Sequence, residues 1–536
     1  MKRGGMRRIA ARLAAAAGVC GLLAACASSG GGDNARPGLE GLRTVAGVIG
    51  ATPATGSPVQ GGTLTFAGYS MRANLDPAKS RPIGSTGSTE LAAVYDTLLR
   101  YDAAAGDYRP QLAESFTESG DHLSWTLRLR PGVRFSDGSA LDADAVIGSI
   151  RRYTRAHGAN SDQFTRTVVG MDRTGDDEVV FRLSAPWTGF PALFTFGYGM
   201  IIAPAGYADP AGFRPLGAGP FAVRDFTPGV SLTVSARDDY WRGRPPLDTV
   251  RFVDISGDKP KTDALRSGDI DMAFLRDPEV IGAATGSFPG YYEPLSLNDV
   301  LQINNRDGHP GADPALRRAI AAALDPSALV ERAYAGAGLA TAEVFPQWSR
   351  WHGDAAAPVH DPEQARRLVQ QAAAGGTDTT LTYVSLNDPV SQATATAMQA
   401  MLGAVGIDVR VDYVATVTDL VKRLYADFDY DIAYGSYSVP DPVAELRLTA
   451  ALESRSPNNV VGYRDAGMDR LLADAQHAVG DDAKQAAFTR IAQKIHDDVP
   501  FVPWATGPNF VPWAPDVHGA VPSNDGIILL DTAWVG

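Results

Sequence analysis

Residues 127–146 read LRLRPGVRFSDGSALDADAV and place three carboxylates, Asp137, Asp142 and Asp144, within eight positions. The run WTLRL (125–129) alternates apolar and polar side chains, which predicts a strand. Pro131-Gly132 follows and predicts a type II turn, because proline fixes φ and glycine adopts the left-handed conformation. We therefore expect WTLRLRPGVRF to form two short strands around this turn.

The three carboxylates of this stretch all have a structural explanation. Ser136-Asp137-Gly138 predicts a second turn. Asp142 can cap a helix that carries apolar residues over 145–150, and Asp144 falls in its first turn, where a carboxylate offsets the positive end of the helix. We do not assign a catalytic role to any of them.

Outside this stretch, strand-like and helix-like segments alternate from residue 63 to the C-terminus, which is typical of α/β domains. The strands are expected at 63–67, 125–129, 178–183, 221–226, 231–237, 249–255, 300–304, 408–413 and 430–434. The helices are expected at 88–101, 314–324, 362–374, 392–405, 468–479 and 481–497. About 511 residues remain after the leader described next, enough for two to four domains.

The N-terminal segment has the pattern of a secretion signal, predicted over residues 1–25. Five basic residues precede an apolar run that is short for a membrane span and ends in Leu23-Ala24-Ala25-Cys26. This end resembles a bacterial lipobox, which implies that Cys26 becomes a lipidated N-terminus. The alternative is cleavage by the general signal peptidase, with Cys26 incidental. Residues 26–60, rich in Ala, Gly, Ser, Thr and Pro, predict a flexible linker.

Composition excludes several classes of protein. Cys20 and Cys26 are the only cysteines, and Cys20 leaves with the signal, so disulfides and cysteine metal sites are excluded. Loss of the five basic residues of the signal takes the formal net charge from -13 to -18. Such an acidic chain is a poor candidate for binding nucleic acid or an anionic membrane surface. No later stretch approaches the roughly 20 apolar residues of a membrane helix.

Several spaced motifs carry a family resemblance. RLRPGVRFSDGSALDADAV is joined, in order along the chain, by PLGAGPFAV (215–223), DDYWRGRPPLDTVRF (238–252), ALRSGDIDMAF (264–274), LQINN (301–305) and DPALRRAIAAALD (313–325). Together they resemble the family-five extracellular solute-binding proteins, the dipeptide, oligopeptide and nickel group of ABC transporters. The resemblance covers roughly residues 61–536. In that family the opening stretch is a fold element.

The resemblance implies a two-lobed α/β fold of the periplasmic-binding-protein type, with a hinge and an extra family-specific domain. Its expected parts are lobe I at 61–97, 206–297 and 505–536, the family-specific domain at 98–205, and lobe II at 298–504. The hinge is expected near 291–300 and 499–504. The implied protein is a monomeric lipoprotein of the extracytoplasmic membrane face, which closes on a small solute or peptide and delivers it to an ABC permease and ATPase.

The sequence offers little that points to catalysis, and we predict no catalytic residue, cofactor or resident metal. It contains no Gly-x-Ser-x-Gly elbow, no His-Glu-x-x-His pair, no phosphate loop and no dinucleotide fingerprint. Of eight scattered histidines only His352 and His360 lie near each other, which is weak evidence for a metal site. Asp313 is expected to cap the helix that follows it.

Aromatic residues fit a cleft that buries a ligand with apolar walls and few polar anchors. Tyrosines occur in and just after the strand expected at 430–434, and tryptophans lie in proline-rich connections. We expect the ligand-binding residues to be Tyr69, Gln302, Asn304, Tyr434, Tyr437, Ser438, Asp441 and Trp504.

The segment YDIAYGSYSVPDPVAEL (430–446) bears on the ligand. In peptide-binding relatives an aspartate four positions before a proline pairs with the ligand's α-ammonium, and aligned on Pro442 this position is Ser438. An unpaired buried ammonium is costly, so either the ligand lacks a free α-amine, as an oligosaccharide, modified peptide or metal chelate would, or Asp441 replaces the aspartate. A sensory receptor without transport and a secreted hydrolase are the alternative functions.

Overall fold

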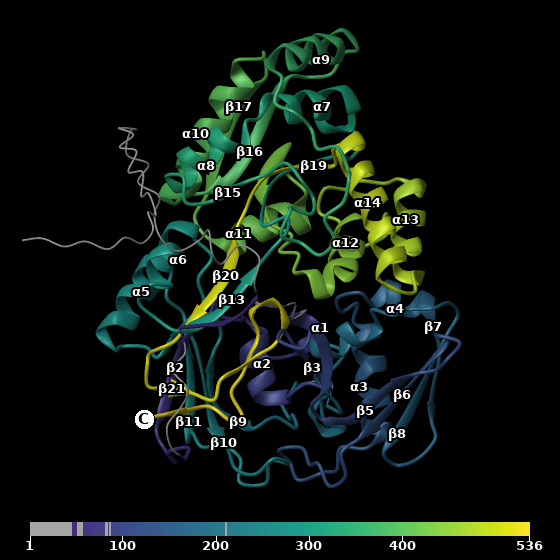
Figure 1. The fold of residues 1–536 in the computed structure, drawn as a ribbon, viewed down its shortest axis with the longest axis vertical. Helices are drawn as coiled ribbons and strands as arrows, with labels where there is room; N and C mark the ends of the chain where they lie inside the picture. The colour runs from purple at the N-terminus through teal and green to yellow at the C-terminus, as the bar shows by residue number, and fades with distance from the viewer. Residues whose placement is uncertain (1–45, 51–56, 81–83, 85–86, 210–211) are drawn as a thin grey trace, which may run out of the picture. The chain divides into compact units, whose positions relative to one another are not determined.

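The computed structural model describes residues 46–50, 57–80, 84, 87–209 and 212–536 (Figure 1). The predicted signal, Cys26 and most of the predicted linker therefore lie outside the described residues. Within them, helices and strands alternate along the chain as the sequence predicts for an α/β protein.

The first lobe contains a five-stranded sheet of order β12-β2-β11-β10-β9 and a three-stranded sheet of order β1-β13-β20. β2 pairs in parallel with β11 and β12, while β9, β10 and β11 pair antiparallel. The strands are β1 (Gly47–Ile49), β2 (Thr63–Ala67), β9 (Phe221–Thr227), β10 (Ser231–Ala236), β11 (Thr249–Val253), β12 (Met272–Ala273), β13 (Gly290–Pro294) and β20 (Pro508–Pro512). The helices are α1 (Pro77–Ser80), α2 (Ser88–Tyr95), α5 (Asp258–Ser267) and α6 (Pro278–Ala284). Two short pairs, β21 (Val517–His518) with β24 (Trp534–Val535) and β22 (Val521–Pro522) with β23 (Ile528–Leu529), complete the lobe.

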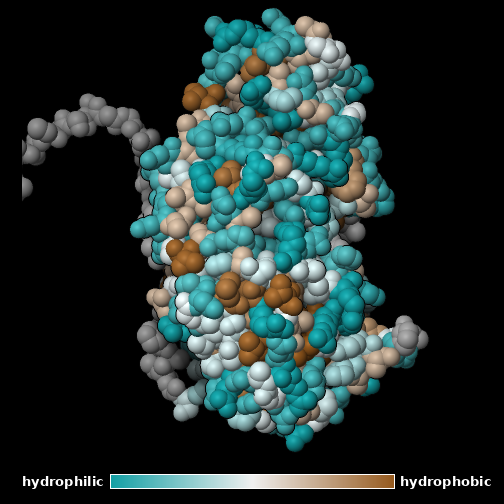
Figure 2. Space-filling view, turned by 90° about the vertical axis from the view of Figure 1, so that its right-hand side faces the viewer, coloured by the Kyte–Doolittle hydropathy of each residue, from teal (hydrophilic) through white to brown (hydrophobic). Residues whose placement is uncertain are grey.

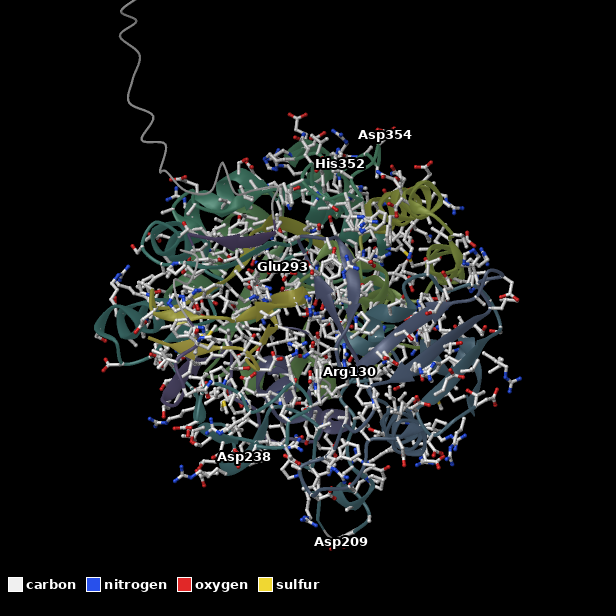
Figure 3. The ribbon with its side chains drawn as sticks, turned by 60° about the horizontal axis from the view of Figure 1, so that its bottom comes forward. Arg130, Asp209, Asp238, Glu293, His352 and Asp354 are labelled. Atoms are coloured by element: carbon white, nitrogen blue, oxygen red, sulfur yellow. The ribbon has the colours of Figure 1, made fainter. Side chains whose placement is uncertain are left out.

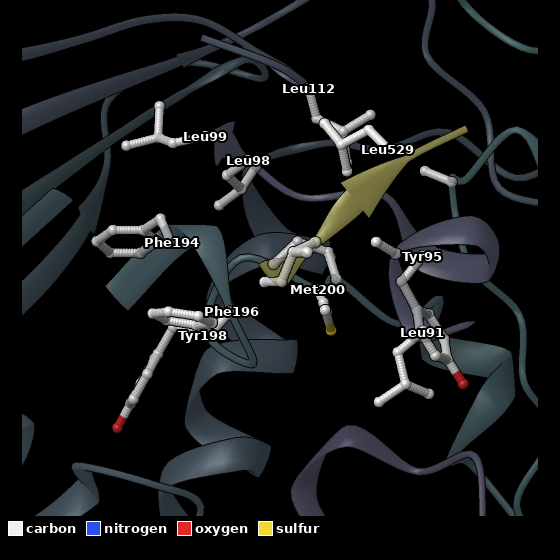
Figure 4. Packing of buried hydrophobic residues seen from close by; sticks show 14 of the residues in the cluster. Leu91, Tyr95, Leu98, Leu99, Leu112, Phe194, Phe196, Tyr198, Met200 and Leu529 are labelled. Carbon is white, nitrogen blue, oxygen red and sulfur yellow. The ribbon is translucent and has the colours of Figure 1, made fainter. Parts of the chain in front are cut away.

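The second group of elements, which we call the middle domain, is antiparallel. Its strands are β3 (Leu99–Asp102), β4 (Asp107–Pro110), β5 (Ala113–Glu118), β6 (Ser124–Leu129), β7 (Val168–Arg173) and β8 (Glu178–Leu183), and its helices are α3 (Ala143–Arg155) and α4 (Ser161–Thr167). β5, β6, β8 and β7 form one sheet and β3 pairs with β4. One apolar core runs from this domain into the first lobe; Figure 4 shows part of it, with Leu98, Met200 and Leu529 contributed by three distant segments.

The second lobe is built on a six-stranded sheet of order β15-β19-β14-β18-β16-β17. Its strands are β14 (Asp299–Ile303), β15 (Leu339–Ala340), β16 (Thr380–Leu386), β17 (Asp408–Val414), β18 (Ile432–Gly435) and β19 (Phe501–Thr506). Its helices are α7 (Pro314–Ala323), α8 (Pro326–Tyr334), α9 (Pro362–Ala374), α10 (Pro389–Gly403), α11 (Val417–Lys422), α12 (Ala444–Leu452), α13 (Ala466–His477) and α14 (Asp481–Asp498). Successive residues of β14 enter different cores, Val300 with α12–α14 and Leu301 with α7–α10, so the sheet is covered on both faces.

The chain crosses between the lobes at two adjacent places. Residues 295–298 join β13 to β14, and Gly507 joins β19 to β20. The two crossings lie side by side because β13 pairs with β20 and β14 pairs with β19. The expected second crossing at 499–504 is wrong by a few residues, since β19 continues the sheet of the second lobe to Thr506.

The opening stretch adopts the structural roles assigned to its carboxylates. Asp142 caps α3 by accepting a hydrogen bond from the amide of Ala145 at 2.8 Å, and Asp137 accepts from the amide of Ser139 at 3.0 Å. Gly132 and Gly138 have φ of +76° and +84°, as the two turns require. The second short strand expected after Pro131-Gly132 is reduced to an isolated bridge between Arg134 and Ala140.

Most predicted elements are present within a few residues of their expected bounds, and the helix expected at 88–101 is the main exception. α2 ends at Tyr95, and Asp96 takes a positive φ of 56°. Leu99, which extends the helical spacing of apolar residues in the sequence, instead begins β3. The turn at Asp96 is held by its carboxylate, which accepts hydrogen bonds from Tyr240 at 2.6 Å and Trp241 at 3.2 Å.

The surface is mainly hydrophilic on the face shown in Figure 2, with hydrophobic residues in small separate groups. Among the described residues, no helix combines the length and apolar character that a bilayer span requires.

Candidate functional site

Arg276 lies at the junction of the lobes, between β12 and α6. The carboxylate of Asp258, at the start of α5, accepts hydrogen bonds from the amides of Arg276 at 2.6 Å and of Asp277 at 2.7 Å, which fixes the backbone here. The guanidinium reaches across to the second lobe, where Nη2 donates to Ser436 Oγ at 3.3 Å and to Ser438 Oγ. Arg276 is thus a first-lobe cation held against second-lobe hydroxyls.

Two further groups surround this guanidinium. Asn298, in the first crossing, accepts from Arg276 Nη2 through Oδ1 at 3.1 Å. The ring of Tyr69, from the first lobe, lies with its centroid 4.9 Å from the Arg276 Cζ atom, a cation–π distance. Arg276 Nε is buried and has no hydrogen-bond partner among the described residues.

The loop that carries the two serines is tied to the first crossing. Ser296 and Val439 exchange backbone hydrogen bonds of 2.9 and 2.8 Å, and the carbonyl of Leu297 accepts from the amide of Ser438 at 3.2 Å. Leu297 and Ser438 have φ of +51° and +46°, a conformation that is strained for residues other than glycine and is concentrated at functional sites. The serine hydroxyls are therefore presented by a constrained loop.

Asp299 begins β14 directly after the first crossing. Its Oδ1 atom accepts hydrogen bonds from the phenols of Tyr334 at 3.0 Å and Tyr434 at 3.1 Å, and its Oδ2 atom is buried without a hydrogen-bond partner among the described residues. Burial raises the pKa of Asp299 to about 6, although both tyrosine hydrogen bonds and the charge of Arg276 act to lower it.

A second cluster of buried charges joins the lobes through Arg447 of α12. Arg447 forms an ion pair with Asp525, from the C-terminal part of the first lobe, and the amide of Asp525 donates to Glu293 Oε1 of β13 at 2.8 Å. Figure 3 shows Glu293 well inside the outline of the fold, whereas Asp209 and Asp354 lie at its edge. Burial raises the pKa of Glu293 to about 8, and burial together with the charge of Arg276 lowers the pKa of Arg447 to about 10.

Polar side chains also connect the middle domain to α12 of the second lobe and to the residues that flank this helix. Gln163 of α4 donates to Glu445 at 3.0 Å, and Arg166 pairs with Glu453 at 2.8 Å. Tyr108 donates to the carbonyl of Pro442 at 2.8 Å. Polar contacts of this kind are typical of an interface between domains of one chain.

Three of the expected ligand-binding residues gather around Arg276. Tyr69 and Ser438 contact its guanidinium directly, and Tyr434 binds the neighbouring Asp299. Tyr437 follows on the same loop and packs its ring against Phe501 with centroids 4.7 Å apart.

The other four expected residues are engaged within the second lobe. Gln302 is buried against Gly435, and Trp504 is fully buried and stacks on Tyr334 with centroids 5.8 Å apart. Asn304 donates to the carbonyls of Phe428 and Tyr430 at 3.1 and 2.9 Å. Asp441 binds Ser349 Oγ at 2.6 Å and the amide of Arg350 at 2.8 Å. Their role toward a ligand stays a prediction.

The described residues contain no group of three or more His, Cys, Asp and Glu side chains arranged to hold a metal ion. His352 Nδ1 lies 2.9 Å from the carbonyl of Phe345 and contributes to the packing of its own loop.

Comparison with known proteins gives one family. The family model of bacterial extracellular solute-binding proteins, family 5 Middle, matches residues 107–453. The probable di/tripeptide-binding protein 5 of Pseudomonas aeruginosa is 24% identical over 498 residues, covering 86% of this chain and 93% of the relative.

Solved structures share the fold. The oligopeptide-binding protein AppA of Bacillus subtilis, in complex with a nonapeptide, superposes with a TM-score of 0.77 at 20% identity and covers 90% of this chain and 100% of its own. AgaA of A. tumefaciens R10, in complex with agropinic acid, gives a TM-score of 0.76 at 24% identity. The match covers 89% of this chain and 99% of AgaA. The predicted two-lobed periplasmic-binding-protein fold is confirmed by these likenesses.

Proposed function

Because this chain belongs to the bacterial extracellular solute-binding proteins of family 5, we propose that it captures a peptide or similar small solute between its lobes and delivers it to an ABC permease. The family consists of binding proteins, so the chain is a solute-binding protein and not an enzyme. The hydrolase alternative is therefore dropped.

The proposal rests on one observation. The two places where the chain crosses between the lobes lie beside polar side chains that both lobes contribute. Two short adjacent connections permit a hinge, and Arg276 and Ser438 meet from opposite lobes next to it. A ligand bound at such a place contacts both lobes and therefore favours the closed arrangement over the open one.

We propose that lobe I comprises residues 61–97, 206–297 and the C-terminal segment, that the middle domain comprises 98–205, and that lobe II lies between the two crossings. The C-terminal segment of lobe I begins after Gly507. The proposal also includes a monomeric protein, tethered through lipidated Cys26 outside the cytoplasm. An oligosaccharide or a metal chelate as ligand, and a sensory role without transport, remain alternatives.

Ligand-driven closure tests the proposal. Spin labels placed by Lys259→Cys in the first lobe and Arg410→Cys in the second, both exposed positions, report the distance between the lobes. Pooled di- and tripeptides, a panel of oligosaccharides and nickel–histidine chelates are added in turn to the full-length protein. We expect one class to shorten the distance and to be recovered unchanged by mass spectrometry. Recovery of a cleaved product, or a distance unaffected by all three classes, would contradict it.

A further inference from the structure

Arg276 differs from Arg152 and Arg447, two other partly buried arginines, in what it contacts. Arg152 pairs with Asp76 at 2.5 Å, and Arg447 pairs with Asp525. The hydrogen-bond partners of Arg276 are the neutral groups of Asn298, Ser436 and Ser438. The charge of Asp299 acts on this guanidinium without a hydrogen bond to it, so a carboxylate that bound the guanidinium directly would give it an anionic hydrogen-bond partner.

The surroundings of Arg276 match the needs of a carboxylate. The fork of guanidinium donors can hold two carboxylate oxygens, and Arg276 Nε is a buried donor still without a partner among the described residues. Ser436 and Ser438 have hydroxyls 3.1 Å apart, and Ser436 also donates to Asn298 Oδ1 over a long 3.4 Å. Rotation of a hydroxyl can redirect its single proton to a carboxylate oxygen bound beside the guanidinium. Cation and hydroxyls thus converge from opposite lobes.

A cationic ligand group is less favoured at the same place. The buried Asp299 has one carboxylate oxygen without a hydrogen-bond partner among the described residues, and its other oxygen already accepts two tyrosine hydrogen bonds. The buried Glu293 already accepts hydrogen bonds from Tyr291 at 3.3 Å and from the amide of Asp525 at 2.8 Å, and Asp525 is paired with Arg447. Asp277 is occupied in capping α6. Of the cations Arg276 and Arg447, Arg447 is paired with Asp525, and Arg276 hydrogen-bonds no carboxylate among the described residues.

We propose that the ligand carries a carboxylate, bound by the guanidinium of Arg276 together with the hydroxyls of Ser436 and Ser438, so that this anion bridges the two lobes. The inference rests on the proposed solute-binding function and names the chemical class of its ligand. It also gives a reason for a serine at position 438, because an aspartate there would neutralise Arg276 and repel the anion.

Matched acid and amide ligands test the proposal. The panel contains di- and tripeptides with a free C-terminus, the same peptides as C-terminal amides, and gluconate beside glucose, each measured by calorimetry. We expect the acids to bind at least tenfold more tightly than their neutral partners. Arg276→Gln should abolish this preference, Arg276→Lys should restore part of it, and Arg251→Gln, an exposed first-lobe arginine, should leave it intact. Equal binding of acid and neutral partners, or an Arg276→Gln protein that keeps the preference, overturns the proposal.

A titration with acetate tests for the carboxylate site at Arg276 even if no ligand of the panel binds. The Nε–H signal of Arg276 in 15N-arginine-labelled protein, assigned by its loss in Arg276→Gln, should shift with acetate and not with chloride at equal ionic strength. Ser436→Ala combined with Ser438→Ala should weaken the shift. An acetate response no larger than that to chloride overturns the carboxylate site. If a neutral ligand still drove closure, the solute-binding function would hold although the carboxylate site did not. The failure of the carboxylate site can thus be told apart from the failure of the solute-binding function.

Discussion

The phenol of Tyr434 donates a hydrogen bond over 3.1 Å to the buried carboxylate of Asp299, at the point where the chain enters the second lobe. Burial raises the pKa of this carboxylate from 3.8 to about 6. At this site the folded protein therefore binds more protons than the unfolded chain between about pH 4 and 6. The contribution of Asp299 to the free energy of unfolding falls as the pH rises through this window.

Asp299→Asn should remove this contribution, because an amide oxygen can accept the same tyrosine hydrogen bonds and does not ionise. The variant should gain stability relative to the wild type by on the order of 3 kcal/mol between pH 4 and pH 7. Urea unfolding of both proteins at intervals of pH measures the difference, and other groups that titrate in this range, such as Glu90 and His496, are common to both and cancel. A stability difference that does not change with pH would contradict this assignment.

Gly219, in the PLGAGPFAV motif, packs against the last turn of α2. Its amide donates to the carbonyl of Val94 at 3.0 Å, and a Cβ atom there would lie 2.6 Å from the carbonyl oxygens of Ala93 and Val94. Since backbone atoms cannot rotate away, Gly219→Ala should lower the free energy of unfolding by about 1–3 kcal/mol. Gly403→Ala is the control: a Cβ at this end of α10 meets nothing within 4 Å, so we expect no loss of stability by denaturant unfolding. Equal effects of the two substitutions would refute the packing argument.

The contact of Gly219 with α2 belongs to the part of the fold that local sequence patterns do not predict. Most strands and helices follow from local periodicity, and the turns at Gly132 and Gly138 from residue type. The end of α2 at Tyr95 does not follow from local periodicity, because Leu98 and Leu99 continue a helical spacing of apolar residues. The helix is ended instead by contacts from distant segments, including Gly219 and the hydrogen bonds that Tyr240 and Trp241 donate to Asp96.

The site was less predictable than the fold for the same reason. Tyr69, Tyr434 and Ser438 were expected, but the residue at their centre, Arg276, was not. It follows a short buried strand as one of many arginines, and no local pattern sets it apart. Its special position arises only when the tertiary fold brings the loop after β12 beside the loop after β18. The sequence feature that could have indicated Arg276 is its place two residues after ALRSGDIDMAF (264–274), one of the motifs that carry the family resemblance.

The lipid anchor predicted at Cys26 can be tested with a matched pair of variants. Cys26→Ala should release the protein from the membrane fraction or leave its signal uncut, whereas Cys20→Ala should have no effect, since Cys20 is predicted to leave with the signal. Each buried CH2 of the lipid contributes roughly 0.8 kcal/mol to membrane binding, so two acyl chains suffice for stable attachment. Mass spectrometry of the mature N-terminus is the measurement. An unmodified Cys26, or a mature protein that begins at another residue, would contradict the anchor.

Asp441 is expected to support its loop rather than to hold a ligand amine. One carboxylate oxygen accepts from Ser349 Oγ and the other from the amide of Arg350, while the Asp441 carbonyl accepts from the indole of Trp351 at 2.9 Å. Asp441→Asn keeps a single acceptor oxygen and leaves one donor unpaired, so it should lower the free energy of unfolding by roughly 1–3 kcal/mol.

Calorimetry with free and N-acetylated versions of the same peptides separates the two roles of Asp441. If Asp441 only supports the loop, Asp441→Asn should leave the ratio of the two affinities at its wild-type value. Ser349→Ala removes a hydrogen bond from the other side of the same contact, and it should reproduce the loss of stability without changing the ratio. The structural role would be wrong if acetylation abolished binding to the wild type and Asp441→Asn bound both forms equally, because the carboxylate would then be the partner of the ammonium.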